Sequence, residues 1–148
     1  MAQTCRIEGE ADVYAAAGMA RGMARGMGFG EADAARIEIA VRELATNILR
    51  HAQCGEIHVR VVTEGNRQGI EIEAVDQGPG IADIGLALQD GYSTSGKGLG
   101  SGLPAVRRLM DTFEIESAVG QGCRVRAARW LRRPTDWLRQ WWERQKQK

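Results

Sequence analysis

The sequence predicts an α+β two-layer sandwich, with a mixed, mainly antiparallel sheet whose helices pack on one face. Two segments in the first third of the chain place apolar residues at the spacing of amphipathic helices. Two later pairs of short apolar runs are each joined by a glycine-containing turn, as in β-hairpins. The patterns follow the order β-α-α-β-β-α-α-β-β-α, which fits helices on one side of a sheet. The other face of the sheet is then solvated or covered by a partner.

The first 52 residues predict one strand and two helices. Cys5–Glu8 alternates polar and apolar residues, as a short edge strand does. A helix capped by Asp12 runs to about Met27 and ends at Gly28-Phe29-Gly30. A second helix spans about Glu31–Ala52, where apolar residues recur with helical periodicity.

The middle of the chain predicts a hairpin followed by two helices. Ile57–Thr63 and Ile70–Val75 are strands, and Gly65-Asn66 between them is a hairpin signal. A short helix near Asp83–Leu88 and a longer one over Leu99–Met110 come next.

The last third predicts a second hairpin and a terminal helix. Phe113–Ser117 and Cys123–Trp130 are strands around Gly120-Gln121-Gly122. Pro134 suits the first turn of a helix that runs towards the C-terminus, because its ring fixes φ near the helical value.

Length and composition limit the possible classes of protein. A chain of 148 residues is enough for one domain with a single core. No apolar run is long enough to span a bilayer, and the N-terminus carries acids where a signal peptide carries bases. The cysteines Cys5, Cys54 and Cys123 are far apart, which indicates reduced thiols rather than a disulfide framework or a zinc site. These features predict a cytoplasmic protein.

The charge is divided unevenly along the chain. Residues 124–148 carry nine basic and two acidic side chains, a net charge of +7, whereas residues 1–123 have a net charge of −6. We therefore divide the chain into a domain at 1–130 and a basic, tryptophan-rich helical extension at 131–148. The extension could pack on the sheet, bind a protein partner or lie on an anionic membrane; packing or partner binding is expected. Nothing outside it forms a basic surface, so nucleic-acid binding is not expected.

The first helix also contains a four-residue repeat. Its methionines, glycines and arginines each recur at that interval: Met19, Met23 and Met27; Gly18, Gly22 and Gly26; Arg21 and Arg25. The expected role is core packing, with glycines permitting close approach and arginines in water. The alternative is an adaptable surface for a partner.

Glu43 and Asn47 form the first of three candidate site motifs. Four residues apart, they share one helix face. An Asn oxygen with phosphate oxygens can ligate Mg²⁺, and Glu43 can orient or deprotonate a nucleophile aimed at a γ-phosphate. The alternative is an ordinary solvated pair, which is favoured for these residues taken alone. Leu44 and Ile48 follow them directly, so the pair flanks the core stripe, and this position favours function.

The second motif, Asp-Gln-Gly-Pro-Gly, follows an apolar strand. Asp76 at the strand end can accept a hydrogen bond from an exocyclic amine such as that of adenine. Gly78 and Gly80 let the backbone approach a base where a side chain would collide. The alternative is a turn closed by an Asx hydrogen bond, and for the motif alone the two readings are equal.

The third motif is a glycine-rich run before a helical pattern: Lys97, Gly98, Leu99, Gly100, Ser101 and Gly102. Backbone N–H groups at a helix start bind phosphate. The spacing matches neither a P-loop nor a dinucleotide-binding turn. Lys97 can reach a terminal phosphate, although a solvated loop lysine is the commoner case. The preceding Tyr92–Gly96 has the small, polar composition of a mobile lid.

In this order, the three motifs resemble those of the GHKL (Bergerat-fold) ATPases. The stretches ELATNILRHA, DQGPGI and LALQDGYSTSGKGLGSGLPAVRRLMDTFEI are similar to one branch, the RsbT-type anti-sigma-factor switch kinases. The resemblance covers roughly residues 5–130. It implies a Bergerat ATP-binding fold, MgATP as the phosphate donor, and a serine/threonine kinase that phosphorylates STAS-domain antagonists in stress-response partner switching. It also implies a PP2C-type phosphatase or a sigma factor as a further partner.

The resemblance assigns roles to single residues. It implies that Glu43 is the catalytic base, that Asn47 holds Mg²⁺ and that Asp76 reads adenine. It also implies that five glycines shape the pocket: Gly78, Gly80, Gly98, Gly100 and Gly102.

Two features depart from the family pattern. The extension passes the usual end of such a domain, and no dimerisation helix with an acceptor histidine is present, so the phosphate acceptor is on another protein. For His51, one turn after Asn47, a structural role is expected. The alternative function is an ATP-binding anti-sigma factor or phosphatase-activating module without phosphotransfer of its own.

Overall fold

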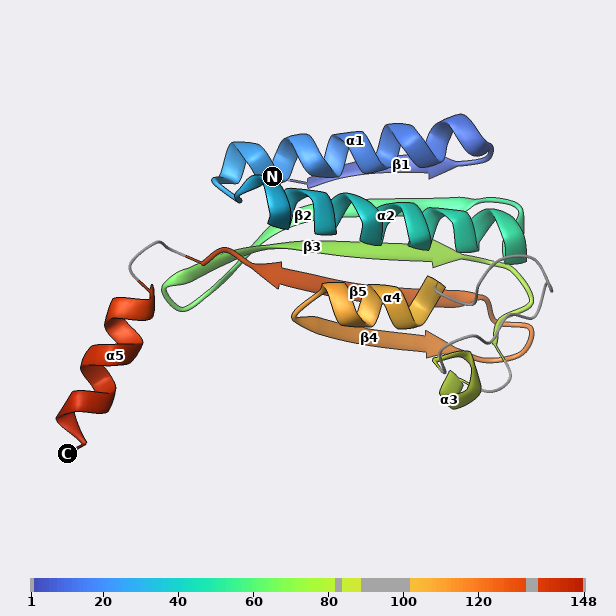
Figure 1. Cartoon of the computed structure of the whole chain (residues 1–148). Coiled ribbons are helices and arrows are strands. Elements are labelled where there is room, and N and C mark those ends of the chain that lie inside the picture. Colours follow the sequence, from blue (N-terminus) through green and yellow to red (C-terminus); the bar gives the residue numbers. More distant parts are fainter. Residues whose placement is uncertain (1, 82–83, 89–101, 133–135, 148) are drawn as a thin grey trace.

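The computed structural model describes residues 2–81, 84–88, 102–132 and 136–147. Figure 1 shows a sheet with helices on one side and a terminal helix standing off from both. The elements are β1 (Ala2–Ile7), α1 (Glu10–Met27), α2 (Glu31–Ala52), β2 (Gly55–Glu64), β3 (Arg67–Asp76), α3 (Ile84–Ala87), α4 (Gly102–Leu109), β4 (Thr112–Ser117), β5 (Cys123–Trp130) and α5 (Asp136–Lys146). Their order is the predicted one. Pro134 and residues 89–101 lie outside the described residues.

The sheet has five strands in the order β1-β2-β3-β5-β4. Each of its strand pairs is antiparallel, so the sheet is antiparallel throughout rather than mixed. Helices α1, α2 and α4 cover one face, which confirms the predicted two-layer architecture (Figure 1). Strands β1 and β4 are the edges, as the short alternating pattern of β1 predicts.

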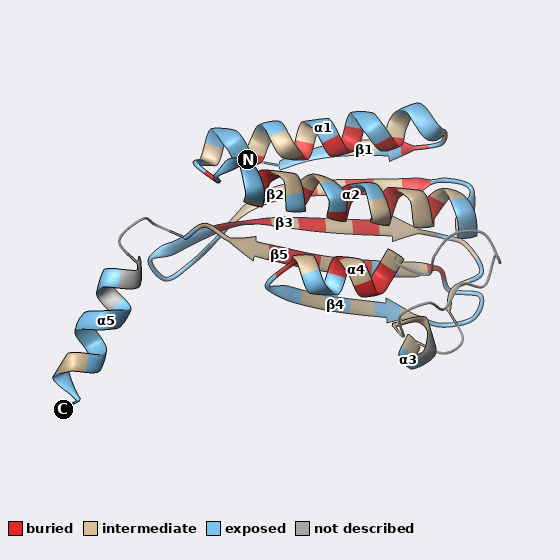
Figure 2. Ribbon diagram, in the orientation of Figure 1, coloured by how far each residue is buried: buried red, intermediate tan, exposed pale blue. Residues whose placement is uncertain are grey.

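The core lies between the sheet and α2. Ile57 and Ile72 point from the sheet into the helical layer and are fully buried. Leu44 and Ile48 of α2 pack in the same cluster. In Figure 2 the buried residues follow the sides of the helices and strands that face each other. This alternation of buried and half-buried strand residues is what a sheet covered on one face requires.

The uncovered face of the sheet carries rows of ion pairs. Arg60 contacts Glu71 at 2.8 Å and Glu73 at 3.2 Å across the β2–β3 pair. Arg126 contacts Glu114 at 3.2 Å across the β4–β5 pair. Charged cross-strand neighbours of this kind belong on a solvated surface. Of the two predicted possibilities for this face, the solvated one matches its composition.

Helix α1 ends where the sequence predicts, but its N-terminal cap differs from the prediction. Gly9, not Asp12, is the N-cap residue, and Asp12 lies three positions inside the helix. Its Oδ2 accepts hydrogen bonds from the backbone N–H groups of Glu8 and Gly9 at 2.9 and 3.1 Å, which is half of a capping box. At the other end Gly28 has φ 104°, a left-handed cap that glycine adopts without strain.

The repeat in α1 is placed differently from the expected packing. A Cβ added at Gly18, Gly22 or Gly26 would meet nothing within 4 Å, so these glycines face open space rather than a closely packed neighbour. The methionines do pack against the core, as expected. The arginines contact α2: Arg21 lies 2.6 Å from Glu38, and Arg25 lies 2.8 Å from Glu31.

The terminal helix α5 keeps large apolar side chains exposed. Leu138, Trp141 and Trp142 are 45%, 47% and 55% exposed. For these three side chains, the expectation that the extension packs back on the sheet is not met. Among the described residues, no helix is both long and apolar enough to cross a membrane.

Candidate functional site

Helix α2 presents Glu43 and Asn47 at the border of its buried stripe. Both side chains are half-buried, whereas Leu44 and Ile48, which follow them, are buried in the core. At 3.6 residues per turn the two polar side chains leave the helix one above the other. The pair therefore lies beside the core and not opposite it, as the sequence pattern predicts.

The end of the glycine-rich run lies against Asn47. Helix α4 begins at Gly102, and a Cβ added there would lie 3.0 Å from Asn47 Oδ1 and 3.1 Å from Asn47 Nδ2. The first and third motifs, more than fifty residues apart in the sequence, thus meet at the start of a helix. The other members of the third motif, Lys97, Gly98, Leu99, Gly100 and Ser101, lie outside the described residues, as does the predicted lid.

Asp76 ends β3 and closes the turn that follows it. Its Oδ1 accepts a hydrogen bond from the backbone N–H of Gly78 at 2.9 Å. This is the Asx turn considered above as the alternative role, and it is present. The turn uses one carboxylate oxygen, and an ionised carboxylate has a second acceptor oxygen for a ligand. The Asx turn and a ligand-binding role are therefore compatible.

The glycines of the second motif are required by the packing of the chain itself. A Cβ at Gly78 would lie 2.6 Å from the Cβ of Ala52, at the end of α2. Gly80 has φ 78°, and a Cβ there would lie 2.1 Å from the carbonyl oxygen of Ala118. Gly78 therefore brings the loop after Asp76 against the helix that carries Glu43 and Asn47. The predicted role of Gly78 and Gly80, letting the backbone approach a nucleotide base, stays a prediction.

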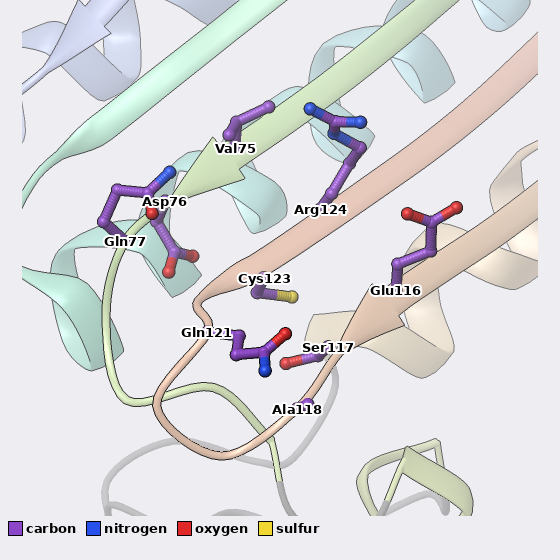
Figure 3. A pocket seen from close by; sticks show the side chains of 9 residues that line it. All are labelled: Val75, Asp76, Gln77, Glu116, Ser117, Ala118, Gln121, Cys123 and Arg124. Carbon is purple, nitrogen blue, oxygen red and sulfur yellow. The ribbon is translucent and has the colours of Figure 1, made fainter.

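A pocket of about 300 Å³ opens beside Asp76, at the ends of β3, β4 and β5 (Figure 3). It is lined by Val75, Asp76, Gln77, Glu116, Ser117, Ala118, Gln121, Cys123 and Arg124. Glu43 and Asn47 do not line it, so the pocket adjoins the Asp76 side of the site rather than the Asn47 side.

Cys123 and Ser117 are the residues that sequence reasoning missed. In the sheet Asp76 pairs with Cys123, and Cys123 pairs with Ser117. Ser117 Oγ accepts a hydrogen bond from the N–H of Ile81 at 2.8 Å and donates to the carbonyl of Gly122 at 2.7 Å. The register of β5 against β3 brings Cys123 and Ser117 beside Asp76. Because β3 is far from β5 in the sequence, the pattern of the β4–β5 hairpin alone does not predict this pairing.

Burial raises the pKa of the Cys123 thiol to about 11, and the negative charge of Asp76 adds to the shift against a smaller opposing hydrogen bond from Ser117. At neutral pH the thiol is therefore protonated and uncharged. A thiolate beside Asp76 would repel both that carboxylate and any phosphate, so the neutral thiol keeps this side of the site compatible with an anionic ligand.

The chain belongs to the histidine kinase-like ATPase domain family, whose model matches residues 9–129. Membership of this family, which the three motifs predicted, means that the chain uses ATP. More narrowly, the chain is of the RsbT type. It is 48% identical over 131 residues to the serine/threonine-protein kinase RsbT of Bacillus subtilis (strain 168), covering 88% of this chain and 98% of that protein.

The chain is also similar to an anti-sigma factor and, in its fold, to two solved structures. The anti-sigma F factor of Thermoanaerobacter sp. (strain X514) is 34% identical over 66% of this chain and 70% of its own length. Among solved structures, a mycobacterial sensor histidine kinase, MprB, shares the fold with a TM-score of 0.54 at 15% identity, covering 88% of this chain and 97% of that one. Full-length ShkA in complex with AMPPNP matches with a TM-score of 0.55 at 18% identity, covering 79% of this chain and 28% of its own.

Proposed function

We propose that this protein transfers the γ-phosphate of MgATP to a serine or threonine hydroxyl of a STAS-domain antagonist protein in a sigma-factor partner-switching pathway. The enzyme class agrees with the name of the Bacillus subtilis relative, a serine/threonine-protein kinase. The observation that carries the proposal is the meeting of Asn47, one turn after Glu43, with Gly102 at the start of α4.

The residues present fit a nucleotide bound with Mg²⁺. The described residues contain no group of three or more His, Cys, Asp or Glu side chains that could hold a metal ion. Asn47 would supply one oxygen, with phosphate and water supplying the others, which suits a cation that keeps part of its hydration shell. When bound, Mg²⁺ would neutralise charge on the phosphate oxygens. The α4 N-terminus, next to Asn47, adds backbone N–H donors for the same oxygens.

The chain's own residues then divide the remaining work. Glu43 accepts the proton of the partner's hydroxyl as its oxygen forms a bond to the γ-phosphorus, and ADP leaves as the bond between the β- and γ-phosphates breaks. The second carboxylate oxygen of Asp76 accepts a hydrogen bond from the adenine amino group. Lys97 adds positive charge near the terminal phosphate, with Gly98, Leu99, Gly100, Ser101 and Gly102 supplying the backbone around it.

Phosphotransfer from labelled MgATP to a purified STAS-domain protein from the same organism tests the proposal. We expect label on a partner serine or threonine. Glu43→Ala should lower the rate by about a hundredfold or more, because a general base contributes roughly that factor. Nucleotide binding should change little, because Glu43 contacts the attacking hydroxyl rather than the nucleotide.

Glu114→Ala is the matched control, because Glu114 is an exposed acid on the uncovered face of the sheet, paired with Arg126. It should transfer phosphate at the unmodified rate. A Glu43→Ala protein as active as this control would disprove the assignment of the base. No label with any STAS-domain protein, while ATP still binds, would disprove the proposed reaction.

One observation favours a second function. The relatives named anti-sigma F factor cover two thirds of the chain, and one from Caldanaerobacter subterraneus subsp. tengcongensis is 35% identical. An ATP-binding module that sequesters a sigma factor, or that activates a PP2C-type phosphatase by contact, would have the same fold. A stable complex with a purified sigma factor or phosphatase, without phosphotransfer to any STAS-domain protein, would favour this function.

A further inference from the structure

Helix α5 presents an apolar surface that the rest of the chain leaves uncovered. Leu138, Trp141 and Trp142 occupy positions i, i+3 and i+4, so they lie on one side of the helix. Their side chains are 45%, 47% and 55% exposed. The helix stands off from the sheet and its helical layer in Figure 1, and its described surface is mostly exposed in Figure 2.

The polar residues of α5 are arranged around this apolar side in a definite order. At 100° per residue, Arg144 lies at one margin of the apolar side and Lys146 at the other. The Lys146 ammonium lies 5.9 Å from the centre of the Trp142 ring. Gln140 and Glu143 lie on the opposite side, away from the tryptophans. Arg144 and Lys146 thus border the apolar surface, and Gln140 and Glu143 point away from it. Gln145, between Leu138 and Trp141 on the helical wheel, is the one uncharged polar residue on the apolar side.

This order is the one that a lipid–water interface selects. Tryptophan prefers the interface because its large ring is apolar and its indole N–H is polar. Lys and Arg at the margins can lay their aliphatic stems along the apolar layer and place their charges among the phosphate groups. We propose that α5 binds the surface of an anionic phospholipid bilayer, lying in the plane of the headgroups and holding the domain at the membrane.

The charge and composition of the chain favour a lipid surface over a groove in a protein. Residues 131–148 carry six basic and two acidic side chains, whereas residues 1–130 have a net charge of −3, so attraction to an anionic bilayer resides in the extension. The buried hydrophobic residues that the structure describes are aliphatic except for Phe29 and Met110, and no tryptophan is among them. By contrast, three of the four tryptophans lie in the extension and not in the domain: Trp137, Trp141 and Trp142.

The place where α5 leaves the domain is compatible with such a tether. Asp76 pairs with Cys123 at the start of β5, and the strand then runs eight residues to Trp130, from which the extension departs. At 3.3 Å per residue, the extension leaves about 23 Å from Asp76, at the other end of the sheet. Binding of α5 to a bilayer therefore leaves the candidate site open to a soluble partner.

Tryptophan fluorescence of the full-length protein with vesicles tests the proposal. Vesicles of equal parts phosphatidylglycerol and phosphatidylcholine should shift the emission to shorter wavelength and carry the protein into the pellet on sedimentation. Pure phosphatidylcholine vesicles should bind at least about tenfold more weakly, because each basic side chain contributes about 1 kcal/mol at an anionic surface. Added salt should reduce binding to the anionic vesicles.

Two variants and a matched control locate the binding surface. Trp141→Ser with Trp142→Ser should lower sedimentation with anionic vesicles by about tenfold or more, since each ring removes a large apolar area from water. Arg144→Gln with Lys146→Gln should lower it and reduce its salt dependence, since two of the six basic side chains of the extension are removed. Gln140→Ser, on the opposite side of the same helix, should bind like the unmodified protein. Phosphotransfer in solution should be the same in all of them, since none touches the candidate site.

Three results would overturn the proposal. One is the absence of binding to anionic vesicles by the unmodified protein. Another is equal binding by the double tryptophan variant, which would place any lipid contact elsewhere. The third is a pair of results: the unmodified protein binds no vesicles, and the double tryptophan variant no longer forms a complex with a purified STAS-domain protein. Together these two results would show that α5 docks on a protein. Because vesicle binding is measured without ATP, it can fail or succeed independently of the proposed kinase reaction.

Discussion

At the scale of single residues, the pair formed by Asp76 and Cys123 determines the chemistry of one wall of the site. The carboxylate closes its own turn through Gly78 and has an acceptor oxygen left for a ligand. The thiol beside it stays protonated because its pKa is raised to about 11. Each of these two residues therefore supports a separate prediction.

Cys123 should react with thiol reagents much more slowly than Cys54. Cys54 is exposed, whereas Cys123 is half-buried beside Asp76. The thiolate is the nucleophile, and a pKa raised from 9.0 to about 11 leaves little of it at neutral pH. Mass spectrometry after timed labelling with iodoacetamide should find Cys54 modified first. Labelling of Cys123 should then rise steeply as the pH approaches 11. Equal labelling of the two cysteines at neutral pH would contradict the environment described here.

Asp76→Asn should weaken ATP binding while keeping the fold. The Asn oxygen can still accept the hydrogen bond from Gly78, so the turn survives. The other carboxylate oxygen becomes an NH₂ group, which cannot accept from the adenine amino group. Loss of a hydrogen bond to a charged group costs about 1.5–3 kcal/mol, or roughly tenfold to a hundredfold in affinity. Isothermal titration with ATP and urea unfolding measure the two properties separately, and an unchanged affinity would rule out Asp76 as the adenine acceptor.

At the scale of elements, local patterns are sufficient where the physical cause is local. The β2–β3 hairpin is predicted correctly because Gly65 and Asn66 are the two residues between its strands. Helix α2 is predicted from its periodicity alone. The N-terminus of α1 is misplaced because Asp12 caps the helix from its third position: its carboxylate accepts from the N–H groups of Glu8 and Gly9, and an acidic residue is favoured at that position as well as at the N-cap. The direction in which a repeat faces, as in α1, depends on the neighbouring helix and is not encoded locally.

Gly22→Ala should stabilise the protein, because this glycine interrupts an exposed helix surface. A Cβ there meets nothing within 4 Å, so alanine adds no clash. Glycine in a helix interior costs about 0.5–1 kcal/mol relative to alanine, mainly through backbone entropy. Urea unfolding should show a gain of about that size. Gly78→Ala, whose Cβ would lie 2.6 Å from that of Ala52, should instead be destabilised. A loss of stability in Gly22→Ala would mean that the exposed side of α1 is covered.

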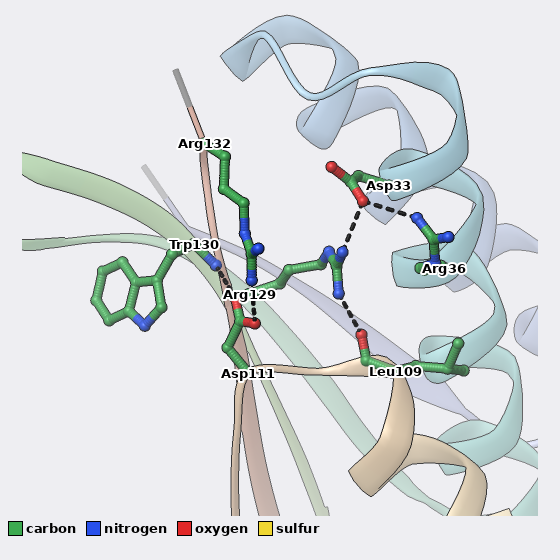
Figure 4. A network of polar contacts seen from close by, with 7 residues as sticks. All are labelled: Asp33, Arg36, Leu109, Asp111, Arg129, Trp130 and Arg132. Carbon is green, nitrogen blue, oxygen red and sulfur yellow. Dashed lines mark hydrogen bonds and ion pairs between the residues drawn. The ribbon is translucent and has the colours of Figure 1, made fainter. Parts of the chain in front are cut away.

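At the scale of the whole molecule, one arginine joins three elements that are distant in sequence (Figure 4). Arg129 of β5 donates to the carbonyl of Leu109, at the end of α4, at 2.7 Å. It also donates to Asp33, in the first turn of α2, at 2.6 Å. Helix α4 starts at the candidate site and α2 carries Glu43 and Asn47, so Arg129 fixes the far ends of both helices that form the site. Asp33 and Arg129 are 96 positions apart in the sequence, which explains why no sequence pattern predicts this contact.

Arg129→Ala should destabilise the whole domain by about 1–3 kcal/mol, because the Leu109 carbonyl loses its side-chain donor and the partly buried Asp33 carboxylate keeps only Arg36 as a partner. Only 14% of the Arg129 side chain and 30% of the Asp33 side chain are exposed. Lysine cannot make both contacts of a guanidinium, so Arg129→Lys should recover only part of the loss. Urea unfolding at neutral pH measures both. A stability of Arg129→Ala equal to that of the unmodified protein would show that the network contributes nothing.

The same network should make part of the stability depend on pH. Burial alone would raise the pKa of Asp33, but the hydrogen bond and charge of Arg129, with a further contribution from Arg36, outweigh it and lower the pKa below 3.8. A carboxyl group with a lowered pKa in the folded state contributes its full stabilisation above its unfolded value. That contribution is lost as the pH falls through the folded value.

Asp33→Asn should therefore be less stable than the unmodified protein at neutral pH, and this difference should shrink as the pH falls below 3.8. Urea unfolding of both proteins across this range measures the difference directly. A difference that stays constant with pH would show that the ion pair with Arg129 is not its source.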